Sequence, residues 1–427
     1  IGGTCLNVGC IPTKALLHTA QGYQNALDRS GGLLAENVRV NWAAMMEHKG
    51  VVVRRLVQGT AGLLRSNGVK VYNGTAVLSS THSVQVDGKE TLEADVIVLA
   101  TGSEPAKIPF PGANLEGVID STGALSLSQC PKSILILGGG VIGVEFAYLY
   151  RSLGAEVTVV EMLPEILPHI DSEISEILRK ELEHQGVKVM TGTKMLSAEK
   201  NGENLSVKVS TDGKEKTLDC EKLLVAVGRR PKTANLGLES VGVATERGAI
   251  VTDEHFQTNI NGIYAIGDCN AKTMLAHAAS AQGVAAIEYA LTGRGYYNGN
   301  VIPSCIYTQP EVGCVGMTET QAKAGGFSCQ VGRFSLSGNG KSLIEGGESG
   351  LVKIVADINT HQILGAHMIG PRVTEIVGEL ALAINCELTV EDVLDTIHAH
   401  PTITEAVHEA AHAVFGNAIH WPPKKKR

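Results

Sequence analysis

A glycine-rich turn between an apolar run and a helical segment is the feature that most constrains the fold of this 427-residue chain. Residues 133–137 read Ser-Ile-Leu-Ile-Leu, and glycines follow at 138, 140 and 143. A second strand-like run covers 156–160 and ends at Glu161. The order strand, glycine turn, helix, strand predicts a βαβ unit. The expected fold class is therefore α/β, with a parallel sheet.

The same unit suits a dinucleotide. Gly138 permits the tight turn, Gly140 lets a pyrophosphate approach the backbone, and Gly143 lets the helix pack closely against the strand. The helix N-terminus offers N–H donors to the phosphates. Glu161 can accept both ribose hydroxyls and would repel a 2′-phosphate, which favours NAD over NADP. A glycine turn that binds no ligand is the alternative.

Two cysteines, Cys5 and Cys10, open the chain in glycine-rich surroundings. On an ideal helix, Cα atoms at this spacing lie about 8.7 Å apart, whereas a disulfide tolerates about 4.4–6.8 Å. A bond between them needs a distorted first turn, for which Gly9 is suited. Strained bridges are the labile ones, so the spacing indicates a redox pair. Two unconnected, half-buried thiols are the alternative.

Composition narrows the class of protein. Hydrophobic residues make up 44% and charged residues 19%, which is typical of a globular chain. The length suggests roughly three domains. A net charge of −8 argues against nucleic-acid binding, and no apolar run reaches the ~18 residues of a membrane span. The chain has nine cysteines, and all of them except the pair Cys5 and Cys10 are scattered along the sequence. This pattern favours a reducing compartment.

Several polar groups carry two interpretations each. His400 precedes Pro401, which is expected to start a helix, and Glu405 could orient the imidazole of a general base. Thr402 and Glu405 also match a capping box. Asp268 ends a strand at 262–268, where it could hold a polyol hydroxyl or cap the next helix. Glu145 could face a cofactor or be stabilised by the dipole of its helix in the first turn.

Two further patterns are assigned no chemistry. His408-Glu409-Ala410-Ala411-His412 matches the zinc-protease motif H-E-x-x-H. No further ligand follows in the expected context, so no metal site is predicted. The basic residues 424–427 resemble a nuclear-import patch, and a solvated tail is the expected interpretation.

Taken together, these segments resemble the flavin-dependent pyridine nucleotide–disulfide oxidoreductases, and within them the lipoamide branch. Residues 2–18 are close to that branch's redox signature, whereas glutathione reductases usually carry a second basic residue at Thr13 and mercuric reductases usually end in a cysteine pair. Further blocks follow in family order at 100–102, 228–231, 265–268, 307–312 and 398–402.

The resemblance implies two Rossmann-like nucleotide-binding domains, for FAD and NAD, and a C-terminal α+β dimerisation domain. The expected ranges are 1–130 for FAD, 131–255 for NAD, 256–300 for a second FAD segment and 301–427 for the interface. The implied reaction is oxidation of dihydrolipoyl groups by NAD⁺. The implied partners are a second copy of the chain, in a homodimer, and lipoyl-bearing proteins of 2-oxo acid dehydrogenase or glycine cleavage complexes. Neither nucleic acid nor a membrane is an expected partner. A different disulfide reductase, or a flavin-free scaffold, is the alternative. The implied compartment is the bacterial cytoplasm, and the mitochondrial matrix is the alternative.

The resemblance also assigns roles. Cys5 would be the interchange thiol and Cys10 the charge-transfer thiol beside the flavin, with His400 as base, Glu405 as its partner, and this pair reaching the disulfide of the other subunit. The implied FAD residues are Lys14 with Glu145, Gly74, Ala76, Thr101, Gly102, Ser103, Asp268, Met274, Leu275, Ala276 and His277. The implied NAD residues are Gly138, Gly140, Val141, Ile142, Gly143, Glu161, Met195 and Gly228.

In these relatives a first βαβ unit, with its own glycine fingerprint, precedes the redox motif. This sequence starts at that motif. We therefore expect the cradle of the FAD pyrophosphate to lie outside the residues given.

Overall fold

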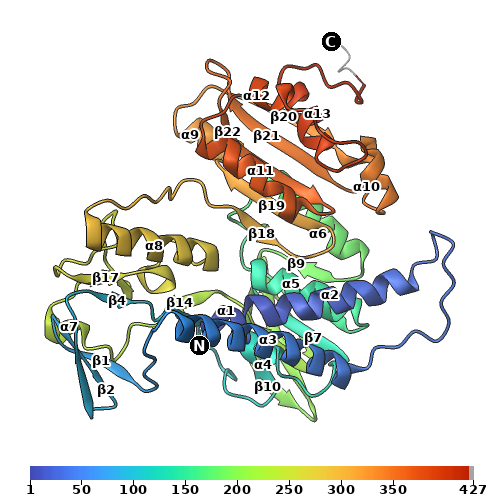
Figure 1. Ribbon diagram of the computed structural model, residues 1–427. Coiled ribbons are helices and arrows are strands. Elements are labelled where there is room, and N and C mark those ends of the chain that lie inside the picture. The colour runs from blue at the N-terminus through green and yellow to red at the C-terminus, as the bar shows by residue number, and fades with distance from the viewer. Residues whose placement is uncertain (423–427) are drawn as a thin grey trace. The chain divides into compact units, whose positions relative to one another are not determined.

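The computed structural model describes residues 1–422 and has a mixed α/β fold (Figure 1). The chain forms two compact units, each made of three separate segments. The first contains residues 1–15, 46–107 and 228–299, and the second contains 16–45, 108–227 and the chain from 300 onward. The basic tail at 424–427 lies outside the described residues.

The second unit contains the predicted βαβ unit. Strand β7 (Ser133–Leu137) runs parallel to β8 (Glu156–Val160), and helix α5 (Val141–Ser152) joins them. Four of the five residues of β7 are buried, which explains its uninterrupted apolar sequence. The whole sheet is parallel, in the order β6-β13-β7-β8-β9. The other strands of this sheet are β6 (Val118–Ile119), β13 (Lys222–Val225) and β9 (Lys188–Met190). The helices in the same stretch of the chain are α5, α4 (Ser121–Ala124) and α6 (Ser172–His184).

An antiparallel sheet packs against this parallel sheet. Its strands are β10 (Thr193–Asn201), β11 (Asn204–Thr211) and β12 (Lys214–Cys220). Inward-facing residues of β11 share one apolar cluster with residues of β7 and β13. This cluster therefore covers one face of the parallel sheet.

The C-terminal part of the second unit is an antiparallel sheet of order β18-β19-β22-β21-β20, covered by helices. Strand β22 is buried along its whole length, and helices α11 and α13 pack their apolar faces into the same core. The strands are β18 (Ser304–Ile306), β19 (Glu311–Gly316), β20 (Cys329–Ser335), β21 (Leu351–Asp357) and β22 (Ile363–Gly370). The helices are α9 (Glu319–Ala324), η2 (Leu336–Gly338), α10 (Gly340–Ile344), α11 (Val373–Asn385), α12 (Val390–Asp395) and α13 (Glu405–Val414).

The first unit gathers short strands around a core of its own. Strand β4 (Ile97–Leu99) pairs in parallel with β17 (Ile263–Ala265), although the two are far apart in sequence. The other elements are α1 (Gly3–Val8), the start of α2 (Cys10–Leu27), α3 (Trp42–Ser66) from Met46 onward, β1 (Ala76–Ser80), β2 (Ser83–Val86), β3 (Glu90–Glu93), β5 (Ser103–Pro105), β14 (Arg229–Pro231), α7 (Leu238–Val241), β15 (Thr245–Glu246), β16 (Ala249–Ile250), η1 (Gly267–Asn270) and α8 (Ala276–Thr292). Residues of β1, β4, α7, β16 and β17 share one apolar cluster.

Element boundaries differ from the predictions in two places. The strand expected at 262–268 covers only Ile263–Ala265. The helix expected to start at Pro401 is α13, which begins at Glu405. Pro401 lies in the turn before α13 and does not start it, and the His400–Pro401 peptide bond is cis.

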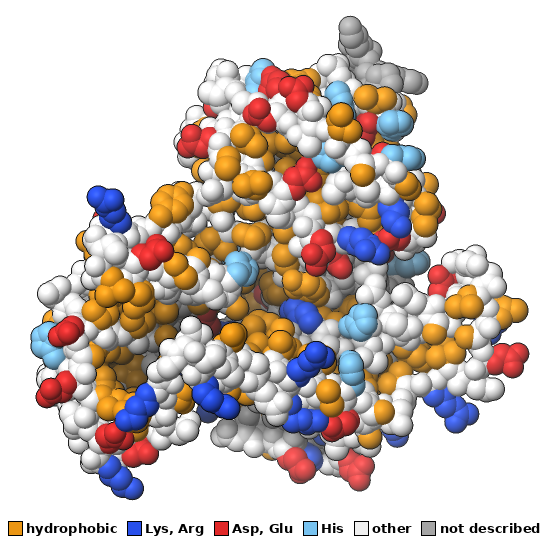
Figure 2. All heavy atoms as spheres, in the orientation of Figure 1, with side chains coloured by type: hydrophobic (Ala, Val, Ile, Leu, Met, Phe, Trp, Pro, Cys, Tyr) orange, Lys and Arg blue, Asp and Glu red, His pale blue; other side chains and the backbone are white. Residues whose placement is uncertain are grey.

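Two surface properties bear on partners. On the face drawn in Figure 2, basic and acidic side chains are interspersed and no continuous basic area is seen, which agrees with the net charge of −8. Among residues 1–422, no helix combines the length and the apolar character that crossing a membrane requires.

Candidate active site

The two N-terminal cysteines flank a break between helices. Helix α1 ends at Val8, Gly9 has non-helical backbone angles, and α2 begins at Cys10. A Cβ atom on Gly9 would lie 2.9 Å from the backbone oxygen of Thr4, so only glycine fits without a shift. The predicted distortion at Gly9 is therefore confirmed.

Both cysteines are present as thiols, and Cys5 is hydrogen-bonded to Cys10. This bond, together with burial, raises the pKa of Cys5 well above its usual range, and the positive charge of Lys14 opposes the shift. Cys10 is the more exposed of the two cysteines, and Cys5 is half-buried.

The glycine turn has the geometry expected of a dinucleotide site. Gly138 has φ +110°, and a Cβ there would lie 2.5 Å from the oxygen of Ala226. A Cβ on Gly143 would lie 2.0 Å from the oxygen of Gly138, because α5 starts directly against the turn. A Cβ on Gly140 would have nothing within 4 Å. Two glycines are needed for packing, and the third leaves space beside the helix N-terminus.

Glu161 follows β8 and is buried beside this turn. Its Oε2 accepts the N–H of Gly139 at 2.6 Å, and its Oε1 accepts the N–H of Leu163 at 2.8 Å. Each carboxylate oxygen has a second lone pair, so both can still accept a hydroxyl. Glu161 was predicted only as a ribose ligand. In the structure its carboxylate also binds the backbone at Gly139 and Leu163.

Glu145 does not lie where the sequence placed it. It is in the second turn of α5, so the expectation that it occupies the first turn is wrong, and the helix dipole falls off before it. Its side chain is buried, at 4% exposure, and Oε1 accepts the N–H of Tyr307 at 3.1 Å. Burial is the main reason that the pKa of Tyr307 rises to about 12.

Asp268 belongs to a hydrogen-bonded network instead of a helix cap. The N-cap of η1 is Ile266, which rules out the capping interpretation. Ser103 donates its hydroxyl to Asp268 Oδ2 at 2.5 Å and accepts Arg229 Nε at 2.7 Å. Arg229 also donates to the backbone oxygen of Ser103 at 2.7 Å. Sequence reasoning missed Arg229; its place directly after Gly228 in the Gly-Arg-Arg-Pro block was the available signal.

The remaining predicted flavin residues are dispersed within the first unit. Gly74 precedes β1, which begins at Ala76, and a Cβ on Gly74 would lie 2.6 Å from an oxygen of Asp87. Thr101 donates to the oxygen of Lys232 at 2.7 Å, and Gly102 has φ +71°. Gly228, which was predicted for NAD, also lies in this unit; it has φ +114°, and a Cβ there would have nothing within 4 Å.

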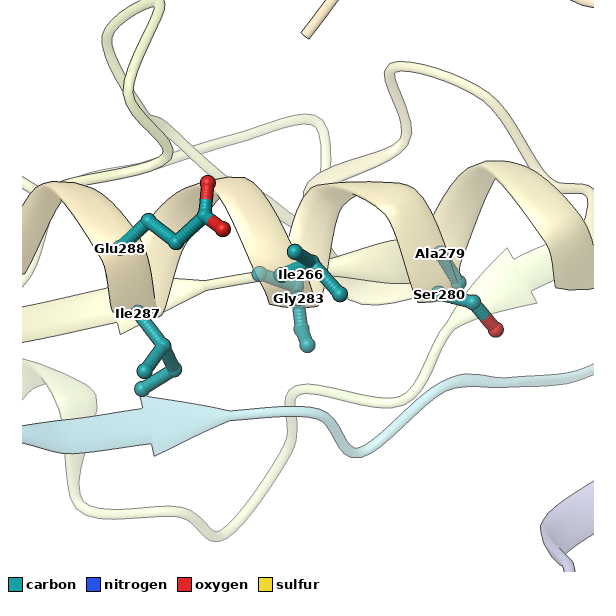
Figure 3. Close-up of a pocket in the computed structure, with 7 residues that line it drawn as sticks. Ile266, Ala279, Ser280, Gly283, Ile287 and Glu288 are labelled. Carbon is teal, nitrogen blue, oxygen red and sulfur yellow. The ribbon is translucent and has the colours of Figure 1, made fainter. Parts of the chain in front are cut away.

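Residues 274–277 lie at the N-terminal end of α8, where Leu275 is the N-cap and Ala276 and His277 are exposed. An apolar hollow occurs farther along the same helix, around Ala279 and Gly283, with Ile266 on its wall (Figure 3). None of the predicted flavin residues lines this hollow.

Met195 occupies β10 in the second unit and packs on the cluster shared by β7 and β11. Its position relative to an adenine stays a prediction.

His400 and Glu405 form the predicted pair. His400 Nδ1 lies 2.9 Å from Glu405 Oε1, and the other oxygen, Oε2, accepts the N–H of Thr402 at 2.8 Å. The capping-box interpretation of Thr402 and Glu405 is wrong, because Thr404 is the N-cap of α13 and Thr402 donates its hydroxyl to the oxygen of Ala399. Hydrogen bonds from Thr402 and His400 lower the pKa of Glu405, despite its partial burial, so the carboxylate stays charged beside the ring.

The H-E-x-x-H segment has a structural use. Buried Glu409 accepts the N–H groups of Ile419 and His420 at 2.9 and 3.0 Å, and its Oε1 lies 2.8 Å from His420 Nδ1. His408 Nε2 binds the oxygen of Leu394 at 3.1 Å. Within the described chain, no group of three or more ligating side chains is arranged to hold a metal ion.

Two sets of residues fit nucleotide cofactors. At the start of α5, no side chain caps the helix and Gly140 leaves open space, which fits a pyrophosphate. In the first unit, the Ser103 and Arg229 contacts hold Asp268 ready to accept a polyol hydroxyl. Both sets are built from side chains or backbone that are already fixed in place.

Residues 1–283 match the family described as "Pyridine nucleotide-disulphide oxidoreductase", and residues 302–411 match its dimerisation domain. The chain belongs to this family. It is accordingly an oxidoreductase with nucleotide-binding domains and a dimerisation domain.

Individual relatives are similar over nearly the whole chain. A mitochondrial dihydrolipoyl dehydrogenase of Schizosaccharomyces pombe is 41% identical, over 99% of this chain and 84% of the relative. A dihydrolipoyl dehydrogenase of Thermus scotoductus is 42% identical, over 98% and 91%. Among solved structures, the HOCl-induced flavoprotein disulfide reductase RclA of Escherichia coli is 28% identical with a TM-score of 0.86, over 97% of this chain and 91% of that one.

Proposed function

We propose that this chain oxidises dihydrolipoyl dithiols with NAD⁺, through a Cys5–Cys10 disulfide and bound FAD. The observation that carries the proposal is the thiol pair at the Gly9 break, where the side chains of Cys5 and Cys10 are hydrogen-bonded. Identity of about 40% to several dihydrolipoyl dehydrogenases over nearly the full chain supports the choice of substrate.

The chain's own residues carry the thiol chemistry. His400, oriented by Glu405, takes the proton from one substrate thiol, and the thiolate attacks Cys5 Sγ of the oxidised pair. The Cys5–Cys10 bond breaks and Cys10 leaves as a thiolate. The second substrate thiol then displaces Cys5, which closes the substrate disulfide and leaves two reduced protein thiols. Lys14 lies close enough to Cys5 to lower its pKa, so a positive charge favours the thiolates that form.

The cofactors are FAD and NAD. We assign Asp268, Ser103 and Thr101 to the flavin, and the turn from Gly138 to Gly143 with Glu161 to the dinucleotide. FAD held by these residues would supply the two-electron chemistry that links the reduced thiols to hydride transfer onto NAD⁺. The ranges 1–130, 131–255, 256–300 and 301–427 remain our proposed division into domains.

The dimerisation domain supports a homodimer. We place the His400–Glu405 pair of one subunit at the disulfide of its partner, and lipoyl-bearing proteins of 2-oxo acid dehydrogenase or glycine cleavage complexes as substrates. A bacterial cytoplasmic location stays our prediction.

Two substitutions test this function in the flavin-loaded enzyme. Cys10→Ser should abolish oxidation of dihydrolipoamide and leave NADH-to-dye activity, because the dye needs no protein disulfide. His400→Gln should slow dihydrolipoamide oxidation by at least ~10²-fold. Cys386→Ser is the control, since Cys386 is exposed on the chain after α11. Equal loss of both activities in Cys10→Ser would contradict the assignment.

The likeness to RclA supports a second candidate, a reductase of a different disulfide. Rates of dihydrolipoamide oxidation with NAD⁺ and NADP⁺, and of glutathione disulfide reduction with NADH and NADPH, separate the two functions. Faster turnover with glutathione disulfide or with NADPH would favour the second.

A further inference from the structure

His400 stands on a loop and not in the core. The loop joins α12, which ends at Asp395, to α13, which begins at Glu405. The His400 side chain is 80% exposed, and Glu405 binds only one nitrogen of its ring. Where the other nitrogen points therefore depends on how the loop backbone is held.

One side chain anchors the first half of this loop. Of the described residues 395–401, all are exposed except His398. The His398 side chain is only 7% exposed, whereas its apolar neighbour Ile397 is 96% exposed. A polar ring is thus buried where an apolar side chain would be expected.

Both ring nitrogens of His398 face oxygen acceptors. Nε2 lies 2.8 Å from Glu379 Oε1 on α11, and Nδ1 lies 3.0 Å from the oxygen of Thr396. Two acceptors are satisfied together when both nitrogens carry a hydrogen. The ring also lies against His408 of α13, with centroids 5.4 Å apart. His398 thereby connects the loop to α11 and α13.

The second half of the loop is held independently. Asn339 donates to the oxygen of Thr402 at 3.0 Å, Thr402 donates its N–H to Glu405, and Ile403 is buried. His400 lies between these two attachments. Loss of the His398 attachment would free the backbone on one side of His400 and leave the other side fixed.

We infer that Glu379 and His398 are positioning residues, which set the direction of the His400 imidazole through the loop backbone. The inference rests on the proposed function, because it assumes that His400 is the base. It assigns no contact with substrate to either residue.

The test removes the acceptor on α11 and measures two activities. Glu379→Ala should lower kcat for dihydrolipoamide by about tenfold, because a displacement of roughly 1 Å can cost up to about 10²-fold. The KM for NAD⁺ and the NADH-to-dye rate should not change. Glu379→Gln keeps an oxygen acceptor for Nε2–H, so it should restore most of the lost turnover.

His361→Gln is the matched control. His361 is bonded through Nδ1 to Glu391, and this second histidine–carboxylate pair lies outside the loop between α12 and α13. This variant should keep wild-type turnover. An equal loss in His361→Gln and Glu379→Ala would indicate general destabilisation and overturn the inference.

A double mutant separates positioning from structure. In a His400→Gln background, Glu379→Ala should cause no further loss, since the base that it positions is gone. A full additional tenfold loss would overturn the inference and leave the proposed function intact. If His400→Gln alone had wild-type turnover, the proposed function would fail first.

Discussion

Alanine substitutions at two glycines of the same turn should have opposite effects. Gly140 and Gly143 lie three residues apart, at the start of α5. In the structure, one glycine serves packing and the other leaves space for a ligand. Gly143→Ala should therefore lower the stability of the fold, whereas Gly140→Ala should weaken only the binding of the dinucleotide.

The magnitudes come from the space at each position. A Cβ on Gly143 would lie 2.0 Å from the Gly138 oxygen, so α5 must move by about 1.4 Å to reach ordinary contact at 3.4 Å. Overpacking of this kind costs about 1–3 kcal/mol. Gly140 has φ −74° and nothing within 4 Å of its Cβ position, so alanine fits. The substitution should be neutral or stabilise by about 0.4–1 kcal/mol.

Denaturant unfolding and NAD⁺ kinetics are the two assays. Gly143→Ala should lower the free energy of unfolding and raise the KM for NAD⁺. Gly140→Ala should unfold like wild type and raise that KM by about tenfold or more, equivalent to ~1.4 kcal/mol. A wild-type KM in Gly140→Ala would refute the assignment of Gly140 to the pyrophosphate. Wild-type stability in Gly143→Ala would refute the packing argument.

Three further predictions concern the helix break and a buried ion network. Gly9→Ala places a Cβ 2.9 Å from a backbone oxygen and should slow oxidation of the Cys5–Cys10 thiol pair, which thiol titration measures. Gly22→Ala is the control, because a Cβ there has nothing within 4 Å and the oxidation rate should not change. Lys353 is 2% exposed, and Lys353→Ala should lower the free energy of unfolding by about 3–5 kcal/mol because its partner Asp171, 4% exposed, stays buried without a counter-charge. Arg333 lowers the pKa of Glu173 from 4.5 to about 2, so stability present above pH 4.5 should be lost as the pH falls towards 2. Glu173→Gln should flatten the unfolding free energy over that interval, and an unchanged slope would contradict the shift.

Local patterns predicted the elements that depend on neighbours in sequence. The βαβ unit, the packing role of Gly143 and the break at Gly9 follow from spacing, because turn geometry and helix rise are local properties. The pairing of His400 with Glu405 also follows from their short spacing, whereas the predicted capping box does not form, because α13 begins only at Glu405.

The sequence by itself determined the α/β class, the glycine turn and the identity of the redox and histidine motifs. Only the tertiary structure decided that Glu145 is buried against Tyr307, that Ser103 and Arg229 hold Asp268, and that Glu379 anchors the loop of His400. Each of these contacts joins residues distant in the chain. A local pattern can point to a residue such as Arg229, but the contacts that its side chain makes depend on which other segments pack against it.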